Sequence, residues 1–436
     1  MTEIMKTTYI YLLIFTFFIG NIFAQQTPAP KQQTDYSIEG ATAHLGNGEV
    51  IENSLIMFSE GKIKFVGRAE MKIARLGTVI NANGKHVYPG FIVANSALGI
   101  GEIDAVRATV DDDEVGTYIP HIRSLIAYNA ESSVVESMRP NGVLMAQITP
   151  RGGTISGTSS IVQLDAWNWE DAALKVDDGI HMNWPESFTS GRWWLGEDAG
   201  AKPDEKYASN VEKLTSFILD GKRYLKSDKN PKNIPFEALT DLFNGTKKLY
   251  VHASGVRQIT DAINFCKEVG IAKMVLVHGD EAYKVADLLI ENNIPVILER
   301  AHREPNKDDD AYDLPFRTAK LLVEKGVTVA IGMEGSMERM SARNLPFYAG
   351  TYAAYGLGKE EGLKLITSNS AKILGIDDKV GTLEVGKDAT LFISEGDALD
   401  MKTNILIYAF IQGRNISLET KQTALWKRYS KKYSSQ

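Results

Sequence analysis

The chain has 436 residues, of which 44% are hydrophobic and 24% are charged, a composition typical of globular proteins and not of disordered or fibrous ones. Its formal net charge is −7, whereas surfaces that bind nucleic acids or other polyanions carry an excess of lysine and arginine. We therefore expect a globular protein without a nucleic-acid partner.

The first 24 residues predict a signal peptide. Lys6 precedes an apolar run over residues 9–19, and Ala24 is a small residue of the kind that precedes a cleavage site. The run is short for a membrane span, and no other apolar run of spanning length follows it. We expect cleavage near Ala24 and an exported mature protein, periplasmic or extracellular, without an integral membrane segment. Residues 25–35, rich in Gln, Pro and Thr, are expected to form a flexible lead-in.

Short strands separated by turns are predicted near both ends of the chain. After Tyr36 they are YSIEGATAHL, SLIMFS and KIKFVG, with a hairpin turn at Glu60-Gly61 between the last two. A similar pattern returns in VGTLEVGKDATLFISEGDAL and ILIYAFIQGRNIS. Together these segments predict one β-sandwich, built from residues 36–86 and 376–416.

The last segment, residues 417–436, predicts a C-terminal helix. Leu425, Trp426 and Tyr429 would lie near one face of this helix, with lysines elsewhere. We expect this face to dock on the protein's own surface. Contact with a membrane surface is the alternative, but it needs a larger apolar area.

Between these parts, residues 87–375 alternate short apolar runs with helical patterns. The clearest strands are KLYVHAS, KMVLVHG, PVILER and VTVAIGM, and each is followed by a helical pattern. The strands are apolar on both faces and recur at the interval that parallel βαβ units require. This pattern predicts an α/β fold, either a barrel or a doubly wound sheet. It does not place the third and fourth strands.

Two histidines and a glutamate follow these strands at corresponding positions. His252 and His278 both lie near the carboxyl end of a predicted strand, one βα unit apart. In barrel enzymes that end of the strands carries ligands and catalytic groups. Either histidine alone is best explained as a core residue, but the pair favours a shared site. Glu334 follows a later strand, as a carboxylate ligand or base, or as an acid that suits the dipole of a helix N-terminus.

Several segments resemble those of a known family. HVYPGFIVANSALG is similar to the entry strand of the amidohydrolase superfamily, and NSAKILGIDDKVGTLEVGKDATL is similar to the exit segment that returns to the β-sandwich. Between them, YVHASG, LVHGDEAYKVAD, PVILERAHREP and SARNLPFYAGTYAAYGL resemble the imidazolonepropionase-like branch. The resemblance covers nearly all of the mature chain. It implies a TIM-like (β/α)8 barrel with a small β-sandwich domain built from both chain termini.

The resemblance also implies a metal site, and this chain departs from it at two positions. The two metal-binding histidines of the entry strand fall on Asn95 and Ala97. Ala97 cannot bind a metal, and an asparagine amide is a weak ligand for zinc or iron beside imidazole. His252, His278 and Glu334 match the remaining ligands. The resemblance therefore implies a three-ligand site for zinc or iron, with His278 and Glu334 as catalytic residues and Glu334 as the acceptor of the proton from water.

Two functions remain open at this point. The first is a hydrolase that uses a metal-activated water to cleave carbon-nitrogen bonds of a small cyclic amide, amidine or dipeptide-like substrate. The second is a catalytically inactive barrel, with or without a bound metal, that binds a ligand or a partner, such as a related amidohydrolase in a homo- or hetero-oligomer. Arg151, in the Gly-rich TPRGGTISG, and His302 and Arg303 are predicted substrate contacts, although the last two also suit an exposed loop.

Overall fold

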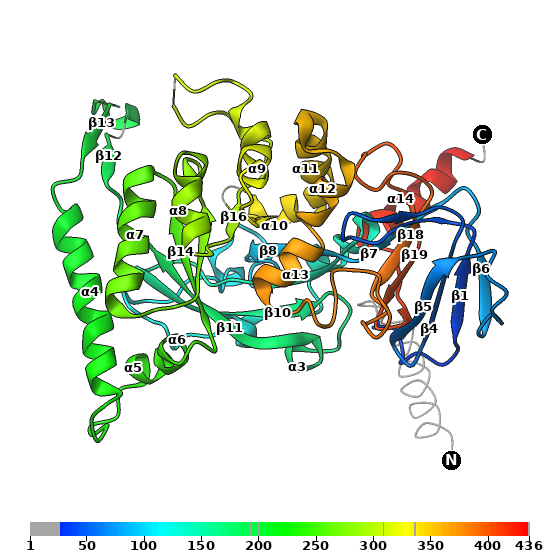
Figure 1. The fold of residues 1–436 in the computed structure, drawn as a ribbon, viewed down its shortest axis with the longest axis horizontal. Coiled ribbons are helices and arrows are strands. Elements are labelled where there is room, and N and C mark those ends of the chain that lie inside the picture. The colour runs from blue at the N-terminus through cyan, green and yellow to red at the C-terminus, as the bar shows by residue number, and fades with distance from the viewer. Residues whose placement is uncertain (1–26, 192, 199, 308, 335–336, 435–436) are drawn as a thin grey trace, which may run out of the picture.

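The computed structural model describes residues 27–434 apart from 192, 199, 308, 335 and 336. It contains a barrel with helices around it and, beside the barrel, two smaller sheets formed by both ends of the chain (Figure 1). The predicted signal peptide lies outside the described residues. Within the described residues, none of the helices combines the length and apolar character that crossing a bilayer demands.

The two smaller sheets pack their apolar faces together. The first has the strand order β5-β4-β1-β6 and the second β20-β19-β18-β7-β2-β3. In the second sheet β7, from the N-terminal part, pairs antiparallel with β18, from the C-terminal part. Ile38, Phe58, Leu391 and Phe410 are among the buried residues between the sheets. The strands are β1 Tyr36–Glu39, β2 Thr42–His44, β3 Val50–Ile51, β4 Ser54–Ser59, β5 Lys62–Arg68, β6 Thr78–Asn81, β7 His86–Pro89, β18 Leu391–Ser394, β19 Leu406–Ile411 and β20 Arg414–Asn415.

Eight strands form the barrel, in the order β17-β16-β15-β14-β11-β10-β9-β8. A parallel bridge between Ala94 and Gly332 joins the first and last strands and closes it. The predicted TIM-like barrel is therefore confirmed. Its strands are β8 Phe91–Ser96, β9 Val143–Ile148, β10 Ile155–Gln163, β11 Ala173–Asn183, β14 Lys248–Ala253, β15 Met274–His278, β16 Val296–Leu298 and β17 Val329–Ile331.

The third and fourth strands, which the sequence pattern did not place, are β10 and β11. β10 runs antiparallel to both of its neighbours, whereas the other neighbouring pairs of this sheet are parallel. Residues 149–154, between β9 and β10, are too few for a helical crossover, so the chain turns back directly. This turn therefore lies at the carboxyl end of β9, at the mouth of the barrel.

Helices cover the outside of the barrel, mainly in its second half (Figure 1). In α7 the buried residues include Ile259, Ile263 and Cys266, which lie on one face, and the helix ends at Gly270, whose φ of +80° suits glycine. The helices are α2 Ser133–Glu136, α3 Trp169–Ala172, α4 Tyr207–Tyr224, α5 Ile234–Ala238, α6 Thr240–Phe243, α7 Val256–Val269, α8 Ala286–Glu291, α9 Leu314–Glu324, α10 Glu338–Ser341, α11 Leu345–Tyr352, α12 Lys359–Lys364, α13 Ser368–Leu374 and α14 Lys421–Ser434.

The C-terminal helix α14 forms, but the prediction that its apolar face docks on the protein is wrong. None of its described residues is buried, and Trp426 and Tyr429 are 69% and 59% exposed. The helix is attached at its first residue, where the Lys421 backbone N–H donates to Glu136 Oε1. The rest of α14 extends past the surface, so its aromatic side chains remain in solvent (Figure 1).

Candidate functional site

The structure brings His252, His278 and Glu334 together at the mouth of the barrel. His252 and His278 lie at the ends of β14 and β15, which pair in parallel, and Glu334 follows β17. Glu334 Oε2 lies 3.2 Å from His252 Nδ1 and 3.2 Å from His278 Nε2. The two histidine nitrogens are themselves 3.2 Å apart. The carboxyl ends of three strands thus place three donor atoms at the corners of a nearly equilateral triangle.

These three donor atoms suit a single metal ion. Atoms that bind one tetrahedral zinc ion at its usual distances lie about 3.3 Å from one another. Within the described part of the chain, this is the one set of three or more His, Cys, Asp or Glu side chains whose ligand atoms approach this closely. Two imidazoles and a carboxylate also form a set that zinc and iron both accept. The residues present therefore fit the metal that the sequence implies.

A carboxylate that the sequence analysis missed holds the His278 ring. Glu299 follows β16, and its Oε1 lies 2.6 Å from His278 Nδ1. Because a carboxylate accepts a hydrogen bond, His278 Nδ1 carries the proton, and Nε2 faces the other two donor atoms. Carboxylates hold metal-binding histidines in this way. The signal was present in the sequence, since Glu299 follows its strand much as Glu334 follows β17.

The His252 ring is held from inside the barrel by a histidine that was also missed. His181, on β11, places Nδ1 2.9 Å from His252 Nε2, and its own Nε2 lies 3.0 Å from Ser159 Oγ. Ser159 donates in turn to Asp178 Oδ1 at 2.7 Å. This chain of hydrogen bonds assigns a proton to His252 Nε2 and leaves Nδ1 directed at Glu334.

The chain of hydrogen bonds ends at a buried carboxylate. Asp178 is 1% exposed and accepts hydrogen bonds from Ser159, from the Tyr250 hydroxyl at 2.6 Å and from Gln147 Nε2 at 3.1 Å. Burial raises the pKa of this carboxyl group. The ring of His181 also stacks on that of Tyr250, with centroids 4.5 Å apart. The network therefore fixes the histidines against the barrel interior.

The candidate ligands differ strongly in their tendency to bind protons. Burial lowers the pKa of His252. Burial also lowers the pKa of His278, but the neighbouring carboxylates of Glu334 and Glu299 outweigh it and raise the pKa to about 10. For Glu334, burial raises the pKa, but Arg151 and the two histidines hold it well below its usual range. Glu334 is therefore ionised, the form that binds a cation, and it is a weak proton acceptor.

The two altered positions of the entry strand hold no ligand. Ala97 is fully buried in the hydrophobic core. Asn95 Nδ2 donates to Glu334 Oε2 at 2.6 Å, while Asn95 Oδ1 accepts from Arg151 Nη1 at 3.0 Å. Both ends of the amide are therefore engaged. Arg151, which was predicted to contact substrate, binds protein groups here: Asn95 on β8 and Glu338 on α10, the latter at 3.0 Å.

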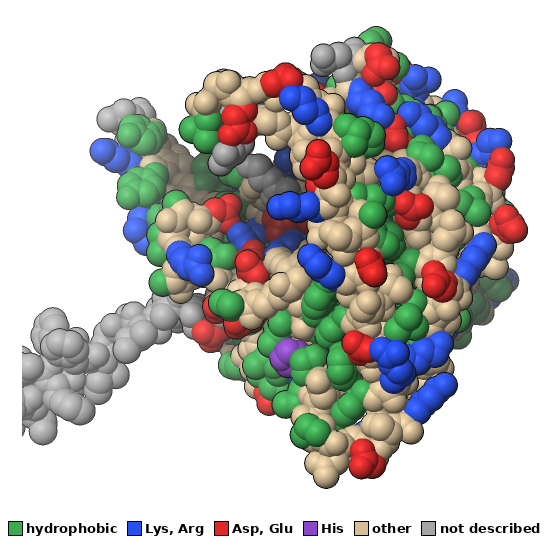
Figure 2. All heavy atoms as spheres, turned by 90° about the vertical axis from the view of Figure 1, so that its left-hand side faces the viewer, with side chains coloured by type: hydrophobic (Ala, Val, Ile, Leu, Met, Phe, Trp, Pro, Cys, Tyr) green, Lys and Arg blue, Asp and Glu red, His purple; other side chains and the backbone are tan. Residues whose placement is uncertain are grey.

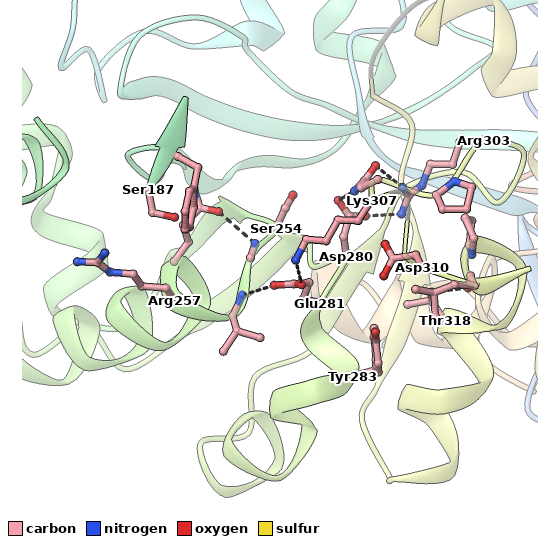
Figure 3. Close-up of a pocket in the computed structure, with 18 of the residues that line it drawn as sticks. Ser187, Ser254, Arg257, Asp280, Glu281, Tyr283, Arg303, Lys307, Asp310 and Thr318 are labelled. Atoms are coloured by element: carbon pink, nitrogen blue, oxygen red, sulfur yellow. Dashed lines mark hydrogen bonds and ion pairs between the residues drawn. The ribbon is translucent and has the colours of Figure 1, made fainter. Parts of the chain in front are cut away.

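A pocket of about 220 Å³ is lined in part by residues that follow β14, β15 and β16 (Figure 3). Ser254 and Asp280, which come two residues after His252 and His278, are among its lining residues. Its apolar walls include Phe188, Tyr283, Pro305 and Leu314. Oppositely charged side chains face one another across the pocket in Figure 3. Figure 2 shows a hollow on the face of the molecule that it displays, with acidic and basic side chains around it.

Most charges of the pocket are paired with one another. Arg303 pairs with Asp280, and Glu281 accepts from Lys307 (Figure 3). Glu281 also accepts from Lys284. The structure thus brings one of the two remaining predicted contacts, Arg303, to the pocket. It places the other elsewhere, because His302 Nε2 lies 2.7 Å from Thr351 Oγ1 on α11.

Known proteins resemble this chain in sequence and in fold. The model of the Amidohydrolase family matches residues 240–420. An imidazolonepropionase of Symbiobacterium thermophilum is 30% identical over 145 residues, 33% of this chain and 32% of that protein. An imidazolonepropionase of Clostridium tetani is 22% identical over 401 residues, 80% of this chain and 86% of that protein. The crystal structure of an amidohydrolase from Thermotoga maritima superposes with a TM-score of 0.75 at 23% identity, covering 87% of this chain and 99% of the other.

These matches agree with the closed barrel and with the residues at its mouth. The family model covers β14 to β17, the strands whose ends carry the candidate ligands, and the match to the Clostridium tetani protein extends over most of the chain. Residues 240–420 thus match the amidohydrolase family, and the longer match to an imidazolonepropionase accords with the imidazolonepropionase-like branch of that superfamily.

Proposed function

We propose that the protein is a metal-dependent hydrolase of carbon-nitrogen bonds in small molecules, such as cyclic amides, amidines or dipeptide-like compounds. One observation carries the proposal: the donor atoms of His252, His278 and Glu334 lie 3.2 Å from one another at the mouth of an amidohydrolase barrel. The names of the imidazolonepropionase relatives support a small cyclic substrate.

Each group of the site has a distinct part in this proposal. Bound zinc or iron would lower the pKa of a water molecule and polarise the substrate carbonyl. His181 and Glu299 hold the two imidazole rings in the tautomers that face the site. The ionised Glu334 completes the ligand set. Its predicted role as proton acceptor stays a prediction, which its low pKa does not favour.

The metal content of the purified protein tests the proposal. We expect close to one zinc or iron ion per chain by elemental analysis, and its loss in His252→Ala. His302→Ala is the matched control, because His302 contacts α11 and not the cluster. A panel of cyclic amides, amidines and dipeptides then screens for hydrolysis. A chain that remains metal-free after incubation with zinc or iron contradicts the proposal.

A specific observation also favours the second function, a ligand-binding barrel without catalysis. Hydrogen bonds from Arg151 and to Glu334 engage both ends of the Asn95 amide, so protein side chains fill the part of the centre next to β8. Incubation with the same panel separates the two functions. A compound that raises the Tm and is recovered intact supports the binding protein, whereas a hydrolysed product supports the enzyme.

We also propose that the protein is exported, on the basis of Lys6, the apolar run and Ala24. Fractionation of cells that express the full-length chain tests this. We expect the mature protein outside the cytoplasm, beginning near Gln25, and retention in the cytoplasm after deletion of residues 2–24.

A further inference from the structure

One charged side chain at the mouth of the barrel, that of Arg151, is not among the proposed metal ligands. Arg151 belongs to the turn of residues 149–154 that joins β9 to β10. Because β10 runs antiparallel, this turn stays at the carboxyl ends of the strands and does not lead into an outer helix. The side chain of Arg151 is 15% exposed. A guanidinium is thereby built into the rim of the candidate metal centre.

The guanidinium is held in one place by protein oxygen atoms. Its Nη1 donates to Asn95 Oδ1 at 3.0 Å, and its Nη2 approaches the Asn95 carbonyl oxygen at 3.1 Å, the Met333 carbonyl oxygen at 3.4 Å and Glu338 Oε2 at 3.0 Å. Asn95 and Met333 lie at or just beyond the ends of β8 and β17, and Glu338 begins α10. The guanidinium therefore occupies the side of the centre where the resemblance implies two histidine ligands.

Only one amide group separates this positive charge from a candidate ligand atom. The amide of Asn95 accepts from Arg151 and donates to Glu334 Oε2 at 2.6 Å. Glu334 Oε2 is also the oxygen that faces both histidines. Arginine keeps its charge at all physiological pH values, so it repels a divalent cation at this oxygen. The amide also donates to a lone pair that a metal would otherwise share. Both effects weaken metal binding.

We propose that Arg151 is a positioning residue that sets the affinity of the site of His252, His278 and Glu334 for its metal ion. This inference rests on the proposed function, in which these three residues bind a metal. Arg151 acts through its charge and through the amide of Asn95, which links it to Glu334. Its carboxylate partner, Glu338, acts in the opposite sense, because it offsets part of the charge of the guanidinium. The centre accordingly releases its metal ion more readily than a site without this arginine.

Zinc affinity, measured by competition with a chelating dye at fixed pH and ionic strength, tests the inference without reference to activity. In Arg151→Gln the zinc Kd is expected to fall at least about tenfold, and in Arg151→Lys, which keeps the charge, it is expected to stay within about threefold of the wild type. Arg123→Gln is the matched control, because Arg123 pairs with Asp177 away from the cluster and its loss leaves the Kd unchanged. An unchanged or higher Kd in a folded Arg151→Gln protein overturns the inference.

A second variant tests the same point in the opposite direction. Glu338→Gln keeps the guanidinium but removes its counter-ion, so the zinc Kd is expected to rise at least about threefold. If Arg151→Gln does not fold, an unchanged or lower Kd in Glu338→Gln overturns the inference by itself.

The outcomes also separate this inference from the proposed function. Zinc that binds Arg151→Gln but not the wild type, and that is lost when His252→Ala is added, supports the role of Arg151 while contradicting a metal-dependent native enzyme. Absence of zinc from both the wild type and Arg151→Gln overturns both proposals. Zinc that binds the two proteins equally leaves the proposed function standing and overturns the role of Arg151.

Discussion

His181 Nδ1 lies 2.9 Å from His252 Nε2, and the other ring nitrogen of His252 faces Glu334. The ring of a candidate metal ligand is therefore fixed by a second histidine deeper in the barrel. His181 is fully buried, and burial lowers its pKa well below the usual value, so it is the neutral acceptor that this contact requires.

Replacement of His181 by alanine is expected to weaken zinc binding by about 10- to 100-fold, the usual effect of removing a group that orients a ligand. Without His181 the His252 ring can turn and expose its protonated nitrogen to the site. The measurement is a competition titration with a chelating dye, with His302→Ala as the control variant. Equal zinc affinity in His181→Ala and the wild type would show that His252 needs no such support.

The neighbouring residues Asp177 and Asp178 offer a matched test of the network inside the barrel. Asp178→Asn is expected to lower the free energy of unfolding by about 1–3 kcal/mol, because Ser159 and Tyr250 donate to different oxygens of Asp178 and the amide nitrogen that replaces one of these oxygens cannot accept a hydrogen bond. Asp177 instead pairs with Arg123 near the surface, so Asp177→Asn should change the free energy of unfolding by less than about 1 kcal/mol. Urea denaturation of both variants checks this. Similar losses in the two would argue against a special role for the buried carboxylate.

Glu281 should make the stability of the protein depend on pH in acid. Burial raises its pKa, but the hydrogen bonds from Lys284, Lys307 and the Val256 N–H outweigh it and lower the pKa from 4.5 to about 2. The folded state thus favours the ionised form. This contribution is complete above the unfolded value near 4.5 and is lost as the pH falls towards 2.

Glu281→Gln removes this contribution. The difference in unfolding free energy between wild type and variant is expected to be about 1–2 kcal/mol at pH 7, after allowance for partial exposure, and to shrink between pH 4.5 and 2. Denaturant titrations of both proteins at a series of pH values measure it. A difference that stays constant through this range would mean that the ion pairs do not hold the carboxylate.

Arg339 should control the mobility of the long segment after β8. It is 8% exposed and pairs with Asp104 and Asp112, which lie on that segment, while Arg339 itself belongs to α10. Arg339→Ala leaves both carboxylates without this partner. We expect faster hydrogen exchange at residues 101–112 and unchanged exchange in β14 and β15, measured by mass spectrometry. Equal exchange at residues 101–112 in both proteins would show that backbone hydrogen bonds alone order the segment.

The second half of the barrel could be predicted from the sequence because its pattern is regular there. Each strand from β14 to β17 is buried on both faces and leads into a helical segment, so the pattern alone places His252, His278 and Glu334 at the same edge of the sheet. Glu299 could have been found by the same rule, because it directly follows β16. It was missed because the segment PVILER, to which it belongs, was interpreted only as a strand.

The first half could not be predicted in the same way. No helix separates β9 from β10, so the spacing that marks a βαβ unit is absent, and the direction of β10 does not show in its sequence. Ser159, Asp178 and His181 lie on the two strands that could not be placed. Their contacts depend on pairing between strands, which a single sequence does not reveal. The sequence also does not reveal that Arg151 lies beside the candidate metal ligands, because the position of Arg151 follows from the direction of β10.

The reversal of β10 also bears on the order in which the barrel folds. Hairpins join strands that are close in sequence, so β9, β10 and β11 can pair early, before any long loop has to close. The pairing of β8 with β17 instead joins the two ends of the barrel and carries the largest entropic cost of loop closure among the neighbouring strands of the barrel. Asn95 and Glu334 are 239 residues apart and lie at this junction. By this argument their hydrogen bond forms late, and the contact of Asn95 with the candidate metal ligand Glu334 is made only once the barrel has closed.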